Sequence, residues 1–119
     1  DVARVFRQVH RVLKPEAPLV CSFPHPAFAM FDPTGADPLR VARPYDQSDP
    51  ITWDLGADVV TDHPRTVSAL FTALHRASFF VDHLLEPTAP ARGAHSSAYT
   101  DAMVTVPATL ILRARKQGN

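Results

Sequence analysis

The amino-acid sequence predicts an α/β fold, and more specifically one part of a larger α/β sheet. Apolar residues with helical spacing occupy two stretches of the chain, and short apolar or aromatic runs next to proline occupy three others. The predicted order is helix, strand, long loop, helix, strand, loop, strand. Two helices and three strands cannot cover both faces of a parallel sheet, so we expect the chain to form about half of a fold.

The first helix is predicted over residues 1–13. Its apolar residues lie on a single face of a 3.6-residue helix, namely Val2, Val5, Phe6, Val9, Val12 and Leu13. Asp1 can cap its start, and Pro15 removes an amide donor and ends it. Residues 19–23, flanked by prolines, are then expected to form a short strand that is buried on both faces.

A long irregular segment, residues 24–65, follows this strand and is dense in Pro, Asp and Gly. Connections of this length inside a compact domain are usually functional lids or binding loops. Within it, residues 51–53 and 58–61 around Gly56 are predicted to pair as a small hairpin. We therefore expect a lid that carries a little secondary structure of its own.

The second half of the chain repeats the pattern of helix and strand. Residues 66–77 have the helical spacing of apolar side chains, and residues 79–85 are aromatic and β-branched enough to form a strand. Residues 108–114 open after Pro107 and predict a last strand. Residues 88–106, between these two strands, are expected to be a second irregular segment.

Composition and charge narrow the class of protein. The chain has 119 residues, 45% hydrophobic and 20% charged, as expected for one ordinary soluble domain. Twelve Lys and Arg balance twelve Asp and Glu, so no basic field favours nucleic acid as a partner. The longest apolar runs are far shorter than the roughly 20 residues of a membrane helix. We therefore expect neither a nucleic-acid partner nor a membrane span.

Two residues, Cys21 and Asp1, give expectations about the redox environment and the origin of the chain. Cys21 is the only cysteine, which excludes an internal disulfide framework and fits a reducing, cytoplasmic location. Its apolar neighbours should raise the pKa of the thiol and keep it unreactive. The chain begins at Asp1 with no initiator Met and no signal-peptide pattern, so we expect it to be cut from a longer protein.

Five short motifs follow one another along nearly the whole chain. They are His10-Arg11-Val12-Leu13-Lys14-Pro15; Leu19-Val20-Cys21-Ser22-Phe23 with His25-Pro26; His63-Pro64-Arg65-Thr66-Val67-Ser68; Leu74-His75-Arg76-Ala77-Ser78-Phe79 with Glu86-Pro87; and the terminal Pro107-Ala108-Thr109-Leu110-Ile111-Leu112-Arg113-Ala114-Arg115-Lys116. In this order and spacing they resemble the C-terminal half of class I S-adenosylmethionine-dependent methyltransferases of the small-molecule type. Three departures concern local geometry: Glu16-Ala17 and Ser78 stand where the family has glycine, and Pro64 interrupts an "HR" pair.

The resemblance implies a fold and an activity. The fold would be the C-terminal half of a Rossmann-like methyltransferase sheet, with an antiparallel last strand. The parent protein would be an enzyme that transfers a methyl group from S-adenosylmethionine to a small-molecule acceptor. In the family, the Gly-rich turn and the acidic residues that hold the cofactor lie upstream of Asp1, and the four glycines present here are isolated. Residues 1–119 would therefore lack the N-terminal cofactor-binding half and be inactive alone.

The resemblance and the sheet geometry together locate the site residues. Ligands of open α/β sheets bind outside the carboxyl ends of the parallel strands, so residues 24–65 would form a substrate lid there, and residues 88–106 would begin and end at the same rim. His25 is the first candidate for a general base and His63 the second; each is alternatively a loop histidine that bonds to backbone. The candidate acceptor-binding residues are Phe28, Phe31, Tyr45, Trp53, Arg65 and Tyr99, with His95 also at the rim. For the aromatic residues, packing of the lid onto the sheet is an equal alternative.

Two rival functions are weighed against the methyltransferase. Six histidines suggest a metal-dependent hydrolase, but the sequence has no HExxH motif and no cysteine pair, so we expect no metal site. The other rival is a non-catalytic binding or dimerisation module derived from a methyltransferase. The oligomeric state, the methyl acceptor and the methylated atom stay open at this point, and the methyltransferase is the favoured prediction.

Overall fold

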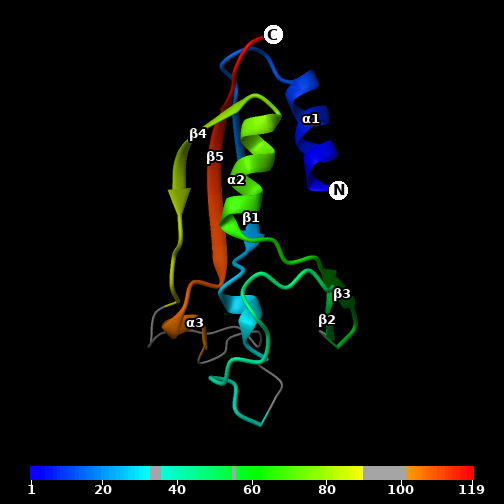
Figure 1. Ribbon diagram of the computed structural model, residues 1–119, viewed down its shortest axis with the longest axis vertical. Helices are drawn as coiled ribbons and strands as arrows, with labels where there is room; N and C mark the ends of the chain where they lie inside the picture. Colours follow the sequence, from blue (N-terminus) through cyan, green and yellow to red (C-terminus); the bar gives the residue numbers. More distant parts are fainter. Residues whose placement is uncertain (33–35, 55, 90–101) are drawn as a thin grey trace. The chain divides into compact units, whose positions relative to one another are not determined.

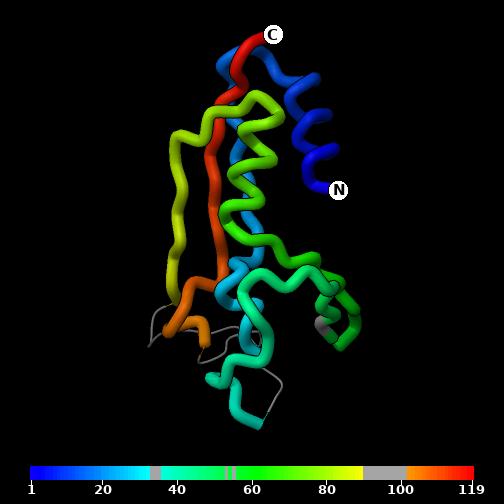
Figure 2. Tube along the Cα trace, viewed as in Figure 1, coloured from blue at the N-terminus to red at the C-terminus, as the bar shows by residue number. Residues whose placement is uncertain are grey.

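The computed structural model describes residues 1–32, 36–54, 56–89 and 102–119 (Figures 1 and 2). The chain divides into two compact units. The first consists of Asp1–Phe23, Val67–Leu85 and Leu110–Asn119, and the second of Pro24–Thr66 and Glu86–Thr109. The two long segments that the sequence predicts as irregular therefore belong to one unit, and the predicted helices and strands lie almost entirely in the other.

Helix α1 spans Val2–Val12 and begins and ends as its sequence predicts. The Asp1 side chain accepts a hydrogen bond from the Arg4 backbone amide at 3.3 Å, which is an N-cap. Leu13 is already extended, and Pro15 follows. The buried Lys116 donates from Nζ to the Leu13 carbonyl at 2.8 Å, so a cation satisfies an acceptor at the carboxyl end of the helix.

The first unit has one hydrophobic core, which lies between two helices and a sheet. Helix α2 spans Val67–Arg76, contacts α1 and β4, and runs along the strands in front of the sheet in Figure 1. The core residues come from both helices, from the turn after α2 and from two strands: Phe6, Leu70, Leu74, Ala77, Phe79, Leu110, Leu112 and Ala114. The face predicted for α1 packs only in part: Phe6 is in the core and Val2, Val9 and Leu13 pack against it, while Val5 and Val12 are exposed.

The sheet of the first unit has three strands in the order β1-β5-β4, with bounds Pro18–Pro24, Thr109–Lys116 and Phe79–Leu85. Strands β4 and β5 pair antiparallel, which confirms the predicted direction of the last strand. Strand β1 also runs antiparallel to β5, because the Lys116 amide bonds to the Ala17 carbonyl while the His25 amide bonds to the Ala108 carbonyl. Strands β1 and β4 are therefore parallel to each other, with β5 between them (Figure 2).

The expectation that the first strand is buried on both faces is wrong. Strand β1 alternates between half-buried and exposed residues, and Val20 is 64% exposed. Leu19 and Phe23 pack against the core, but both helices of this unit lie on that same face. Phe80, on the outer face of β4, is likewise 57% exposed. An apolar run shows that a strand suits an apolar environment but does not show how many of its faces are covered.

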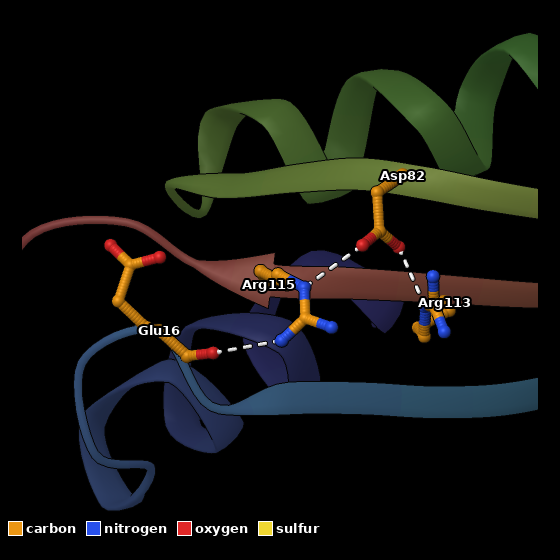
Figure 3. A network of polar contacts seen from close by, with 4 residues as sticks. All are labelled: Glu16, Asp82, Arg113 and Arg115. Carbon is orange, nitrogen blue, oxygen red and sulfur yellow. Dashed lines mark hydrogen bonds and ion pairs between the residues drawn. The ribbon is translucent and has the colours of Figure 1, made fainter.

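A polar cluster lies on the outer face of the same sheet (Figure 3). The pairing of β4 with β5 shifts between Val81 and His83, so Asp82 occupies a β-bulge. Its carboxylate accepts hydrogen bonds from Nε of Arg113 at 2.8 Å and from Nε of Arg115 at 2.9 Å. These bonds, that of Arg113 foremost, hold the pKa of Asp82 below its ordinary value. The Asp82 carboxylate therefore links two arginine side chains of β5 across the bulge.

Two turns of the first unit use a left-handed backbone without glycine. Glu16 has φ 66° and Ser78 has φ 62°, and they are the non-glycine residues with positive φ in the described part of the chain. The Ala17 amide bonds to the Lys14 carbonyl, which closes a four-residue turn with Glu16 in its third position, where glycine is favoured. These are the positions at which the methyltransferase motifs have glycine, so the resemblance and the backbone agree.

The second unit carries short elements. The 3₁₀ helix η1 spans Phe28–Met30, and strands β2, Ile51–Asp54, and β3, Val59–Asp62, pair antiparallel as the predicted hairpin. Helix α3, Ala102–Thr105, lies in the segment predicted to be irregular. In the described ranges, no helix has the length and apolar character needed to cross a membrane.

Candidate functional site

The ends of three strands meet at one edge of the sheet. His25 directly follows β1, Glu86 directly follows β4, and Ala108 directly precedes β5. The His25 backbone amide donates to the Ala108 carbonyl at 3.0 Å, and the His25 side chain contacts the Glu86 carboxylate. Since β1 and β4 are parallel, this edge is the carboxyl end of both strands, where ligands of open α/β sheets bind.

The hydrogen bonds of the His25 ring define its tautomer. The residue is 4% exposed, and its Nδ1 accepts a hydrogen bond from the Ala27 backbone amide at 3.0 Å. An Nδ1 that accepts cannot carry a proton, so the single proton of the neutral imidazole is on Nε2. Nε2 lies 2.5 Å from Glu86 Oε2 and therefore donates to it. In this arrangement both ring nitrogens are engaged, and the ring is neutral.

Glu86 is the exposed member of this pair. Its side chain is 47% exposed, whereas that of His25 is almost fully buried. The bond to His25 uses Oε2, and within the described residues Oε1 has no hydrogen-bond donor. The site thus presents a half-exposed carboxylate, one oxygen of which is bonded to a buried histidine.

The role of Glu86 was missed at the sequence level, where it appears only as part of an "EP" motif. His25 and Glu86 are 61 residues apart, so no local pattern joins them. A usable signal was present, since Glu86 directly follows the predicted strand 79–85 and His25 follows the predicted strand 19–23 after one proline. Applying that rule to every strand, and not to the first one alone, would have brought Glu86 into the site.

The other predicted residues of the lid segment take different positions. Phe31 is buried and forms a bridge with Val41, so it packs the segment internally. Phe28 is half-buried in η1, and Tyr45 is exposed. Trp53 lies in β2, where its backbone is paired with Val60.

His63 and Arg65 lie together at the end of the hairpin. His63 is exposed, and Arg65 donates from Nη1 to the His63 carbonyl at 3.0 Å. Burial raises the pKa of the neighbouring Asp62, an effect that these two residues oppose. No hydrogen bond between described groups joins His63 to His25.

Arg43 has a structural role in the lid segment. Its Nη1 donates to the Ala29 carbonyl at 3.2 Å and to the Phe31 carbonyl at 3.1 Å. The backbone amides of Ala42 and Arg43 both bond to the Met30 carbonyl. Arg43 therefore satisfies carbonyl groups around η1 through its Nη1.

Tyr99 and His95 lie outside the described residues. Cys21 is half-buried, and burial raises the pKa of its thiol, as expected. Over the described ranges, no group of three or more His, Cys, Asp or Glu side chains is arranged to hold a metal ion.

Two solved structures with a similar fold are S-adenosylmethionine-dependent methyltransferases. The first, a provisionally assigned methyltransferase from Listeria monocytogenes, has a TM-score of 0.75 and 22% identity, and the match covers 99% of this chain and 56% of that one. The second, from Mesorhizobium loti, has a TM-score of 0.57 and 23% identity, and the match covers 98% of this chain and 55% of that one. The chain thus spans about half the length of these structures.

Comparison of the sequence with protein-family models and with curated proteins finds no match. The likeness is therefore one of structure, and at this level of identity it establishes the fold. The chain has the fold of roughly half of an S-adenosylmethionine-dependent methyltransferase, consistent with the C-terminal half that its motifs predict.

Proposed function

We propose that the chain is part of an S-adenosylmethionine-dependent methyltransferase that acts on a small-molecule acceptor. The observation that carries the proposal is the likeness to two methyltransferase structures over nearly the whole chain. The two positive-φ residues at positions where the family motifs have glycine support it independently of that likeness. The activity belongs to the parent protein, because the chain corresponds to about half of either structure.

The cofactor is proposed to bind mainly to another part of the parent protein. A cofactor cradle needs glycines at which the backbone approaches the ligand closely. At the described glycines, Gly56 and Gly118, an added Cβ would meet no atom within 4 Å, so neither lines a close-fitting cradle. The described residues therefore do not fit the cofactor, and the role proposed for this segment is on the acceptor side.

Residues 24–65 are proposed as the lid over the acceptor. Methyl transfer requires that the acceptor be aligned and that water be kept out, and a segment that begins at the carboxyl end of β1 could do both. The proposed contacts are Phe28, Tyr45, Trp53, Arg65 and, from the second segment, Tyr99. Phe31 would support them from inside the lid. His25 is proposed to act at the site through Glu86, and His63 is the remaining candidate for direct proton transfer.

Calorimetric titration with S-adenosylmethionine tests the proposal. The full-length parent protein is expected to bind the cofactor at micromolar concentration and to transfer its methyl group to an acceptor from a small-molecule panel. The segment 1–119 is expected to bind no cofactor. A parent protein that binds none would refute the methyltransferase, whereas micromolar binding by the segment would refute only the assignment of the cofactor site to another part.

A further inference from the structure

The pair of His25 and Glu86 carries a net negative charge. The Ala27 amide holds a hydrogen bond to Nδ1, so an imidazolium, which needs a proton on both nitrogens, would have to break that bond. The contact with Glu86 is therefore a hydrogen bond from a neutral donor to a carboxylate and not an ion pair between two charges. The charge of the Glu86 carboxylate is left without a compensating cation from His25.

Among the described residues, no Lys or Arg side chain forms an ion pair with Glu86. The guanidinium of Arg43 donates to the carbonyls of Ala29 and Phe31, and that of Arg65 donates to the carbonyl of His63. A carboxylate that is half exposed, and that is bonded through one oxygen to a buried ring, is a ready partner for a positively charged donor. Exposure of the Glu86 carboxylate alone would not indicate a ligand-binding site. Its bond to a buried ring, which fixes its position, does indicate one.

We propose that Glu86 binds a protonated amine of the methyl acceptor, and that His25 is a positioning residue that fixes the Glu86 carboxylate. The statement that the ligand is a methyl acceptor rests on the proposed function. The amine site itself depends only on the contact between His25 and Glu86. The ligand class is an organic ammonium attached to an apolar body. The ammonium would donate to the Glu86 carboxylate, and the apolar body would face the aromatic residues of the lid, such as Phe28 and Tyr45.

A titration with benzylammonium tests the binding role in the full-length protein. Binding is followed by the NMR shift of the Ala27 backbone amide, which bonds to the His25 ring and is present in every variant, with benzyl alcohol and phenylacetate as probes of similar shape that lack the positive charge. Benzylammonium is expected to give a saturable shift, and Glu86→Gln to raise its dissociation constant about tenfold or more because a charge-assisted bond is lost. The matched control is Glu16→Gln, at an exposed glutamate of the other unit, which is expected to change nothing.

Two substitutions of His25 separate positioning from packing. Glutamine can place an N–H donor near the position of Nε2, whereas asparagine can only replace the acceptor at Nδ1. His25→Gln is expected to retain benzylammonium binding within a few-fold, and His25→Asn to weaken it about as much as Glu86→Gln does. A merely structural histidine would not produce this difference between two amides. The Ala27 amide resonance reports whether the local turn is kept in each variant.

Three results would overturn the inference: the absence of a saturable shift with benzylammonium, equal binding of phenylacetate, or Glu86→Gln binding like the wild type. Failure of the proposed function is recognised separately, because cofactor titration does not involve Glu86. A parent protein that binds S-adenosylmethionine but not benzylammonium keeps the function and loses the amine site. A protein that binds benzylammonium through Glu86 but no cofactor keeps the site and loses the function.

Discussion

Replacing Glu16 or Ser78 by glycine should stabilise the protein. At φ 66° and 62° each residue holds its Cβ in the left-handed region, which costs an L-residue about 1–2 kcal/mol. Glycine removes that cost but loses about 0.5–1 kcal/mol more conformational entropy on folding. The net gain in the free energy of unfolding is therefore expected to be about 0.5–1 kcal/mol at each site.

Neither substitution removes an interaction that the structure assigns to the side chain. Figure 3 shows the Glu16 carboxylate turned away from Arg115, whose Nη1 bonds instead to the Glu16 carbonyl at 3.3 Å. The Ser78 amide and carbonyl bond to His75 and Gln117 through the backbone, and glycine keeps both bonds. The change in stability is therefore assigned to the backbone conformation alone.

Denaturant unfolding measures this effect, read as a shift of the midpoint at unchanged slope. Glu16→Ala and Ser78→Ala are the matched controls, because alanine removes the same functional groups but keeps the Cβ. We expect both alanine variants to lie near the wild type and both glycine variants above it. Alanine variants as stable as the glycine variants would refute the argument, since the benefit would then come from losing the side chain.

Three further predictions concern the first unit. Leu74→Ala should lower the free energy of unfolding by about 2–5 kcal/mol, because Leu74 is fully buried. Phe71→Ala, on the exposed face of the same helix, should lower the free energy of unfolding far less. Denaturant midpoints measure both changes. The lowered pKa of Asp82 means that its bonds stabilise the fold above the ordinary carboxyl pKa and that this contribution is lost as the pH falls through the lowered value. The midpoint difference between wild type and Asp82→Asn should therefore shrink in acid. The raised pKa of the Cys21 thiol predicts slow reaction with a thiol reagent in the native protein and a large acceleration on unfolding; native labelling at the rate of a free thiol would contradict it.

The elements that sequence reasoning located are those whose signals are local. The Asp1 cap and Pro15 act within one turn of a helix, and the hairpin around Gly56 depends on a few adjacent residues. These signals do not require knowledge of the rest of the fold. They therefore predicted the order of helices and strands and most of the boundaries.

The features that were missed depend on contacts between distant parts of the chain. Whether Val20 is covered depends on where both helices pack, and the bulge at Asp82 depends on the register between β4 and β5. The bond between His25 and Glu86 is of the same kind, since it exists only because two parallel strands end side by side. The periodicity of apolar residues predicts which face of a helix or strand is apolar, but it does not predict which residues that face contacts.

The two roles considered for His25 differ in what the ring must be able to do. A general base needs a free lone pair that reaches the acceptor, but Nδ1 already accepts from Ala27 and Nε2 already donates to Glu86. The ring is also buried, so a ligand at this edge would meet Glu86 before it met His25. The feature that made His25 attractive, its place at the carboxyl end of β1, holds equally for Glu86 at the end of β4. The geometry therefore favours the carboxylate as the group that contacts a ligand and the histidine as the group that holds it in place.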